Sequence, residues 1–268
     1  MSIRRDDVRR LVHEHLNASM LMVALDEPLE PGIPISEALA YLDENGFDLA
    51  LLRSPEVRIV YRDQLAQVDE RNRGNPVKSK ARNPRADRLI EHSLELGEVA
   101  RRLREDAVPL LVIGRTGPQF IVTRADFTRP AGQAGVLAVL VALDAQLDEL
   151  LRDFDEEAWN KLSAQRQKAI EVHVERARKR SEEMYRLSYL TLGERFEVVR
   201  QLELSGRLAL GLGTQSEHEL VTAVRNEIAH GREVRGGVEV IRALEVAERI
   251  LDAIADRGRA GMTGSEPS

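Results

Sequence analysis

The sequence predicts an α+β fold with two halves. The first half contains two copies of a helix–strand–strand unit, and the second half is all-helical. The first half contains an internal repeat with strand-like apolar runs, and from about residue 133 the apolar residues recur at helical spacing. A length of 268 residues supports two parts, because it exceeds the usual size of a single domain. Aromatic residues make up only 4% of the chain, so aliphatic side chains must fill both cores.

Two segments of the first half share one pattern. Residues 34–52 read PISEALAYLDENGFDLALL and residues 95–113 read ELGEVARRLREDAVPLLVI, each a helical pattern followed by an apolar strand. A second strand follows in both copies, within RIVYRDQL at 58–65 and FIVTRADF at 120–127. Such a unit cannot bury its helix alone, so we expect the two copies to pack as a pseudo-symmetric pair with a cleft between them.

The second half is predicted to be helical throughout. A helix at 131–155 connects the halves, and the periodicity then predicts a helical domain at 156–257 with a tail at 258–268 that we expect to be disordered. The repeat pair and what precedes it occupy 1–130. Within the helical domain, helices are expected at Glu156–Leu190, Leu192–Leu210, Gln215–His230 and about Val238–Arg257.

Composition limits the function classes. The absence of cysteine excludes disulfides, thiolate metal sites and a cysteine nucleophile, and no apolar run is long enough for a membrane helix. With no secretion signal, we expect a cytoplasmic protein. The net charge is −6, but Arg71–Arg88 is rich in basic residues and is broken by Gly74, Pro76 and Pro84. This basic loop suits an anionic ligand, or it is simply a solvated loop.

The end of the second copy resembles a nucleotide-binding signature. FIVTRAD at 120–126 is similar to the strand-then-turn motif of tandem cystathionine-β-synthase-type (CBS) domains, and the resemblance covers roughly residues 8–130. It implies that Thr123 and Asp126 face the ribose of an adenosine nucleotide, where a carboxylate accepts hydrogen bonds from both hydroxyls. In copy one, Tyr61 and Gln64 stand at these positions, so we expect one working site. Alternatively, Thr123 and Asp126 only cap the following turn.

One heptapeptide of the helical half, RNEIAHG at 225–231, combines an arginine, an asparagine and a histidine. Asn226 and His230 are four residues apart and share a helix face, whereas Arg225 is turned by about 100° from Asn226. Gly231 predicts a left-handed stop that places His230 in the last turn of its helix, where the helix dipole favours the imidazolium. A histidine there suits proton transfer.

In its all-helical context this heptapeptide resembles the Arg-(four residues)-His signature of the HEPN superfamily (higher eukaryotes and prokaryotes nucleotide-binding), over about residues 156–257. The superfamily includes many metal-independent ribonucleases. The resemblance implies a homodimer whose composite site contains Arg225, Asn226 and His230 of both copies.

The chemistry expected at that site is RNA cleavage by the RNA's own 2′-hydroxyl, giving a 2′,3′-cyclic phosphate and a 5′-hydroxyl without a metal. His230 is the general acid or base, Arg225 stabilises the charge at phosphorus, and Asn226 orients the histidine or a phosphate oxygen. The simpler alternatives are that His230 satisfies carbonyls of the last helical turn, and that Arg225 pairs on the surface with Glu219 or Glu227.

Together, the two resemblances predict a nucleotide-regulated endoribonuclease, in a role such as stress response or antiviral defence. The expected regulatory ligand is an adenine nucleotide or a nucleotide second messenger, and catalysis needs no cofactor. One alternative is a non-catalytic nucleotide-sensing dimer that binds RNA or a protein partner. Another is the toxin half of a pair with an inhibitor.

Overall fold

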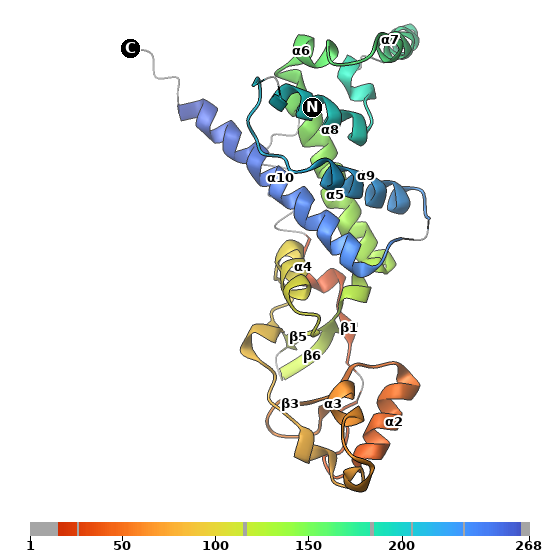
Figure 1. Ribbon diagram of the computed structural model, residues 1–268, viewed down its shortest axis with the longest axis vertical. Helices are drawn as coiled ribbons and strands as arrows, with labels where there is room; N and C mark the ends of the chain where they lie inside the picture. Colours follow the sequence, from red (N-terminus) through yellow and green to blue (C-terminus); the bar gives the residue numbers. More distant parts are fainter. Residues whose placement is uncertain are drawn as a thin grey trace. The chain divides into compact units, whose positions relative to one another are not determined.

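The computed structural model describes residues 16–25, 27–114, 117–182, 185–204, 206–232 and 234–263, with side chains up to residue 257. The chain has mixed α and β structure and divides into two compact units (Figure 1). We call them the helical unit and the strand unit. The helical unit comprises Met1–Met20, Glu95–Glu105 and Arg124–Ser268, and the strand unit comprises Leu21–Leu94 and Asp106–Thr123.

The first copy of the repeat has the predicted order of elements. Helix α2 (Ile35–Asn45) is followed by the antiparallel strands β2 (Leu49–Leu52) and β3 (Arg58–Tyr61) and by the short helix α3 (Arg62–Ala66). Helix α2 stops at Gly46, whose φ of 66° places it in the left-handed region that glycine adopts without strain. The apolar face of α2 packs with the hairpin into one core, whose buried members include Ile35, Ala38, Leu42, Leu52, Val60 and Leu65.

The second copy supplies the centre of a four-stranded sheet. Its strands β5 (Leu110–Gly114) and β6 (Gly117–Val122) are antiparallel, and the short strands β1 (Val23–Ala24) and β4 (Leu89–Ile90) complete the order β1-β6-β5-β4. The two hairpins share buried side chains, namely Leu49, Ile59 and Leu111. The copies therefore pack through their strands. The basic segment forms three short 3-10 helices: η2 (Glu70–Asn72), η3 (Val77–Lys80) and η4 (Ala86–Arg88).

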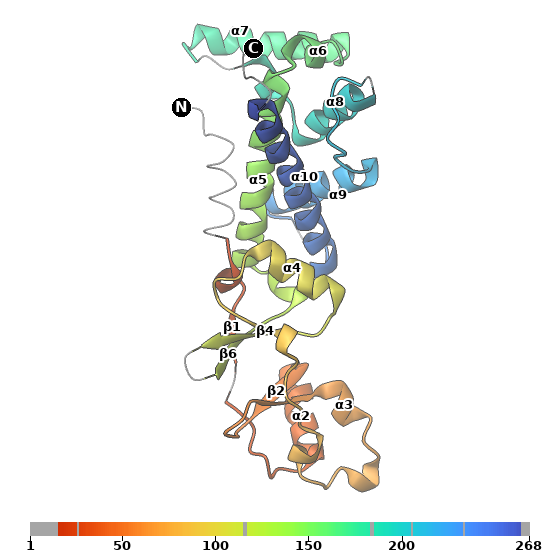
Figure 2. The same cartoon turned by 90° about the vertical axis from the view of Figure 1, so that its left-hand side faces the viewer.

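The helical unit is built around two long helices that lie side by side, α5 (Pro130–Arg152) and α10 (Gly237–Thr263) (Figures 1 and 2). α10 also packs against α4 (Leu96–Glu105), α9 (Gln215–Ala229) and the 3-10 helix η5 (Arg124–Thr128). The remaining elements are η1 (Ala18–Met20), α6 (Asp155–Trp159), α7 (Ala164–Lys179), η6 (Arg186–Tyr189) and α8 (Leu192–Leu204). No described helix is long and apolar enough to cross a membrane.

Three helix predictions need correction. The helix expected at Glu156–Leu190 is three elements, because Ser163 caps the start of α7 by accepting a hydrogen bond from the backbone N–H of Arg166. The helix expected to reach Leu210 ends at Leu204, where Gly206 turns the chain with a φ of 71°. α10 continues to Thr263, so residues 258–263 of the expected tail are helical, since helix growth adds a hydrogen bond per residue. Residues 264–268 lie outside the described residues.

The compact units also differ from the expected boundaries at 130 and 155. α4 belongs by sequence to the second copy of the repeat, but it lies in the helical unit. Its buried residues Leu96, Val99, Ala100 and Leu103 form an apolar face, and α10 packs against this helix. Burial of an amphipathic face stabilises a helix more than its own propensity does, so α4 follows its packing partner.

Candidate functional site

The C-terminal end of α9 carries the heptapeptide. The helix starts with a capping box between Thr214 and Glu217 and ends at His230. Gly231 has a φ of 60°, and its N–H donates to the carbonyl of Ile228 at 3.1 Å; the N–H of Arg232 donates to Glu227 at 2.9 Å. This is a Schellman motif, and it confirms the predicted stop at Gly231.

His230 is exposed, and its side chain forms no hydrogen bond to the rest of the described chain. Two carbonyls of the last turn already accept hydrogen bonds from the backbone N–H groups of Gly231 and Arg232. The imidazole is therefore not occupied in ending the helix.

Arg225 and Asn226 form a pair beside this end. Both side chains are half-buried, and Nη1 of Arg225 donates to Oδ1 of Asn226 at 3.1 Å. The two candidate acidic partners are engaged elsewhere: Glu227 accepts from Nε of Arg235 at 2.8 Å, and Glu219 accepts from Gln215 at 2.9 Å. Within the described part of the chain Arg225 forms no ion pair, so most of its N–H groups are free for an anion.

A groove between α8 and α9 leads to Asn226. Its volume is about 340 Å³, and the residues that line it are Gly193, Phe196, Glu197, Arg200, Gln215, His218, Glu219, Thr222, Ala223 and Asn226. His218, isolated in the sequence, is 6% exposed and stacks on Phe196 with ring centroids 4.3 Å apart. No local sequence pattern marks this groove, because its two walls come from separate helices.

The two residues of the expected ribose site lie in different units. Thr123 is half-buried and is the last residue of the strand unit, whereas Asp126 lies in η5 of the helical unit. Asp126 is 2% exposed, and its Oδ1 is 3.0 Å from Nη1 of Arg129. A ribose that binds Asp126 must therefore displace an ion pair and uncover a buried carboxylate.

The basic segment is partly neutralised. Arg85 and Arg88 both bind Asp106, at 3.2 and 3.0 Å, and Nε of Arg73 donates to the carbonyl of Val68 at 3.2 Å. Within the described residues Lys78 has no ion pair. It borders a cavity of about 370 Å³ in the strand unit, whose lining is Pro31, Leu52, Arg53, Ser54, Pro55, Arg58, Lys78 and Ala81.

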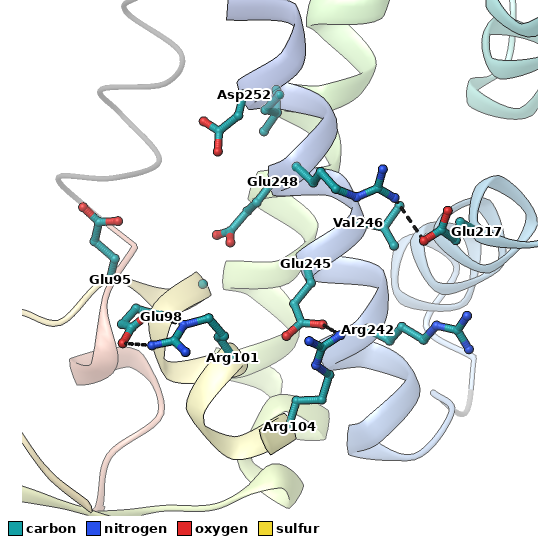
Figure 3. Close-up of a pocket in the computed structure, with 13 residues that line it drawn as sticks. Glu95, Glu98, Arg101, Arg104, Glu217, Arg242, Glu245, Val246, Glu248 and Asp252 are labelled. Atoms are coloured by element: carbon teal, nitrogen blue, oxygen red, sulfur yellow. Dashed lines mark hydrogen bonds and ion pairs between the residues drawn. The ribbon is translucent and has the colours of Figure 1, made fainter. Parts of the chain in front are cut away.

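A second cavity of the helical unit, about 540 Å³, lies where α4 meets α10 (Figure 3). Glu248 and Asp252 project from α10 on the side of Glu95 and α4. Burial raises the pKa of Glu248 to about 7, and the charges of Asp252, Glu95 and Glu245 add to the rise. Arg104 binds Glu245 at 2.9 Å. No group of three or more potential metal ligands occurs among the described residues.

No family model and no curated protein matches the sequence. Several solved structures that the chain resembles are CBS-domain proteins. The CBS domain of a bacterial CNNM/CorC family Mg²⁺ transporter, solved in complex with ATP, is 17% identical, with 46% of this chain and 90% of that chain covered and a TM-score of 0.35. CBSX2 in complex with AMP is 20% identical, with 44% and 98% covered and a TM-score of 0.38.

The hexameric CBS-CP12 protein from bloom-forming cyanobacteria is 16% identical, with 72% of this chain and 98% of that chain covered and a TM-score of 0.36. All three TM-scores are below 0.5, so none of these similarities assigns a fold or a ligand to this chain.

Proposed function

We propose that this chain is a metal-independent endoribonuclease that acts as a homodimer, with a composite site formed by Arg225, Asn226 and His230 of two copies. The observation that carries the proposal is that, among the described residues, no carboxylate binds Arg225 and no group binds the side chain of His230. The side chain of His230 is exposed and forms no hydrogen bond to the described chain, and Arg225 has no carboxylate partner among the described residues. Both are available to a phosphodiester.

The chemistry follows from the roles of the three side chains. His230 of one copy takes the proton of a 2′-hydroxyl, whose oxygen attacks phosphorus and forms the O2′–P bond. His230 of the second copy protonates the leaving 5′-oxygen as the P–O5′ bond breaks. Arg225 stabilises the charge on the phosphoryl oxygens. Asn226 orients the histidine or a phosphate oxygen, and its hydrogen bond from Arg225 keeps it beside the guanidinium. Two copies are needed because each chain offers one histidine here.

The proposed regulatory ligand is an adenine nucleotide or a nucleotide second messenger. Thr123, at the end of the strand unit, and Asp126, in η5 of the helical unit, are the proposed ribose contacts. α4, the helix of the second copy, packs against α10, and α10 packs against α9. These contacts give a ligand signal a physical route to Arg225 and His230. RNA cleavage that starts only when a ligand binds fits a role in stress response or antiviral defence, or as a toxin.

The test is cleavage of end-labelled single-stranded RNA in EDTA, with and without ATP, AMP and cyclic oligoadenylates. His230→Ala and Arg225→Ala are each expected to lower the cleavage rate by about 10²–10⁴-fold, since each removes a group that acts in the transition state. The matched control is His92→Ala, which removes an exposed histidine of the strand unit and leaves the rate unchanged.

Two results contradict the proposal. Cleavage by His230→Ala at the wild-type rate places the activity elsewhere. If the wild type cleaves no RNA under any condition but binds RNA measurably, the result supports instead a non-catalytic nucleotide-sensing dimer.

A further inference from the structure

Helix α7 is attached to the rest of the helical unit along one side. Its two buried residues, Ile170 and Ala177, lie on that side, and the helix packs there against η6. Nη2 of Arg166 donates to Oε2 of Glu194 at 2.9 Å and ties the first turn to α8. The opposite side of α7 faces solvent.

The solvent-exposed side of α7 is cationic. With about 3.6 residues per turn, the exposed residues at its centre fall within a sector of about 120°. The sector contains four cations, which we call the cationic face, and three uncharged residues: Lys168, Arg176, Lys179 and Arg180, and Gln165, Ala169 and Val172. The carboxylates of α7, on Glu171 and Glu175, lie outside this sector. A polyanion along the cationic face therefore meets no negative charge of this helix.

The stability of α7 does not account for the cationic face. Within the described structure Lys168, Arg176 and Arg180 form no ion pair, and Nζ of Lys179 is 3.8 Å from Oε1 of Glu175. Arg176 is one helical turn from both Lys179 and Arg180, and like charges at this spacing destabilise a helix. The helix dipole favours cations only in the last turn, so Lys168, in the second turn, gains nothing from it.

The backbone at the end of α7 keeps the cationic face in one piece. The N–H groups of Ser181 and Glu182 donate to the carbonyls of Arg178 and Ala177, each at 3.0 Å, in a Schellman motif. Arg180, which precedes this motif, is thereby held at the end of the helix. The face spans about 18 Å along the helix axis, because it covers about twelve residue steps of about 1.5 Å each.

A row of cations of this length fits a polyanion better than a single phosphate. A strand of nucleic acid in a duplex presents a phosphate about every 3.4 Å along the axis, so several phosphates lie within reach of the face. A membrane surface fits less well, because a helix that lies on a bilayer exposes a wide apolar face beside its cations. Among the described residues of α7, Val172 is the one large hydrophobic side chain that is exposed.

We infer that the cationic face of α7 binds the phosphate backbone of RNA at a place separate from the cleavage site. The inference rests on the proposed function for the identity of the polyanion. α7 lies apart from α9, whose end carries Arg225 and His230, in both views of the chain (Figures 1 and 2). Contacts to phosphates carry no sequence information, so the face contributes affinity for any sequence and does not act in the cleavage step.

The test measures the salt dependence of binding with a fluorescent 2′-O-methyl oligouridylate, which lacks the attacking hydroxyl. The double variant Arg176→Gln/Arg180→Gln of the full-length protein is expected to lower the slope of log K against log[salt] by about 1.4, or about 0.7 for each lost contact to a single strand. Its Kd is expected to rise about tenfold near 0.1 M salt. Arg176→Lys/Arg180→Lys keeps both charges and is expected to keep the wild-type slope. In cleavage of unmodified RNA, the glutamine variant is expected to raise KM and leave kcat unchanged.

The matched control is Arg207→Gln/Arg242→Gln, which removes two exposed cations of the helical unit outside α7 and changes the net charge equally. An unchanged slope in the α7 glutamine variant overturns the inference. An equal loss of slope in the control overturns it too, since net charge then explains the binding.

A membrane is the ligand instead if the α7 glutamine variant loses binding to phosphatidylserine vesicles and keeps the wild-type slope for RNA. Cleavage by the wild type with an unchanged slope in the α7 glutamine variant removes the inference and retains the proposed function. A lowered slope without cleavage of unmodified RNA by the wild type does the reverse.

Discussion

Glu248 is a carboxylic acid placed where its charge is costly. It lies on α10 against Gly97 of α4, and a Cβ added at Gly97 would overlap its carboxylate. The side chains that face it are acidic, namely Glu95, Glu245 and Asp252, and burial together with these charges raises its pKa to about 7. Gly97 of α4 thus leaves room for the carboxyl group of Glu248 on α10. The folded state favours the protonated form of this carboxyl group.

This predicts a definite pH dependence of stability. A pKa of about 7 in the folded state, against an ordinary value of 4.5, means that the folded protein holds a proton that the unfolded chain releases. The contribution of Glu248 to the free energy of unfolding is therefore fully present below pH 4.5 and declines as the pH rises to about 7. Glu248→Gln is expected to be more stable than the wild type at pH 8, by up to about 3 kcal/mol, and equal to it near pH 4.

The measurement is chemical denaturation of both proteins between pH 4 and 8, with the exposed carboxylate variant Glu239→Gln as the control on the same helix. If the free energies of unfolding of the wild type and of Glu248→Gln differ by the same amount at every pH between 4 and 8, the expected pH dependence is wrong.

The side chains of the candidate sites differ in how far the sequence reveals them. The motif 225–231 is contiguous, so its spacing and its glycine stop can be read directly, and the structure confirms that stop. His218 gives no such signal, since the groove it lines depends on Phe196 and Glu197 of another helix. Asp126 is visible as a motif residue, but its burial and its pairing with Arg129 are not.

At the scale of elements, the start of α10 is fixed by a close backbone approach. A Cβ at Gly237, the first residue of α10, would lie 2.7 Å from the carbonyl carbon of Arg124 in η5. The side chain of Arg124 in turn donates to the carbonyls of Leu103 at 2.7 Å and Arg104 at 3.0 Å, at the end of α4. η5 is thus held to both helices.

Gly237→Ala is expected to destabilise the helical unit by about 1–3 kcal/mol, because the added methyl group meets backbone that cannot rotate away. The matched control is Gly236→Ala, where the nearest atom within 4 Å is the flexible carboxylate of Glu239 at 3.0 Å. Urea denaturation of the two variants measures the difference. An equal free energy of unfolding for both would show that η5 and α10 separate without cost.

At the scale of the whole molecule, the second copy of the repeat is divided between the units. Its strands β5 and β6 belong to the strand unit, whereas α4 packs with α10 in the helical unit. The same polypeptide segment therefore contributes to both cores. A ligand that changes the strands has a covalent connection to the helix that borders α10.

Nucleotide binding at the proposed contacts predicts a change in η5. A ribose that takes Asp126 must release Arg129, so ATP, AMP or cyclic oligoadenylate is expected to change amide hydrogen exchange over Arg124–Thr128 and the first turns of α10. Asp126→Asn is expected to abolish the response, and Asp63→Asn, an exposed carboxylate of α3, to keep it. Unchanged exchange with all three nucleotides, measured by mass spectrometry, contradicts the assignment of Asp126.

The sequence by itself determined the order of elements in both copies, the connecting helix α5, and the start and stop of α9. These depend on apolar periodicity and on capping residues a few positions apart, so the information is local. The tertiary structure alone decided that α4 packs on α10, that Glu248 lies against Gly97, and that His218 faces a groove. Each of these brings together residues from separate elements, and such a pairing is set by which buried surfaces fit one another.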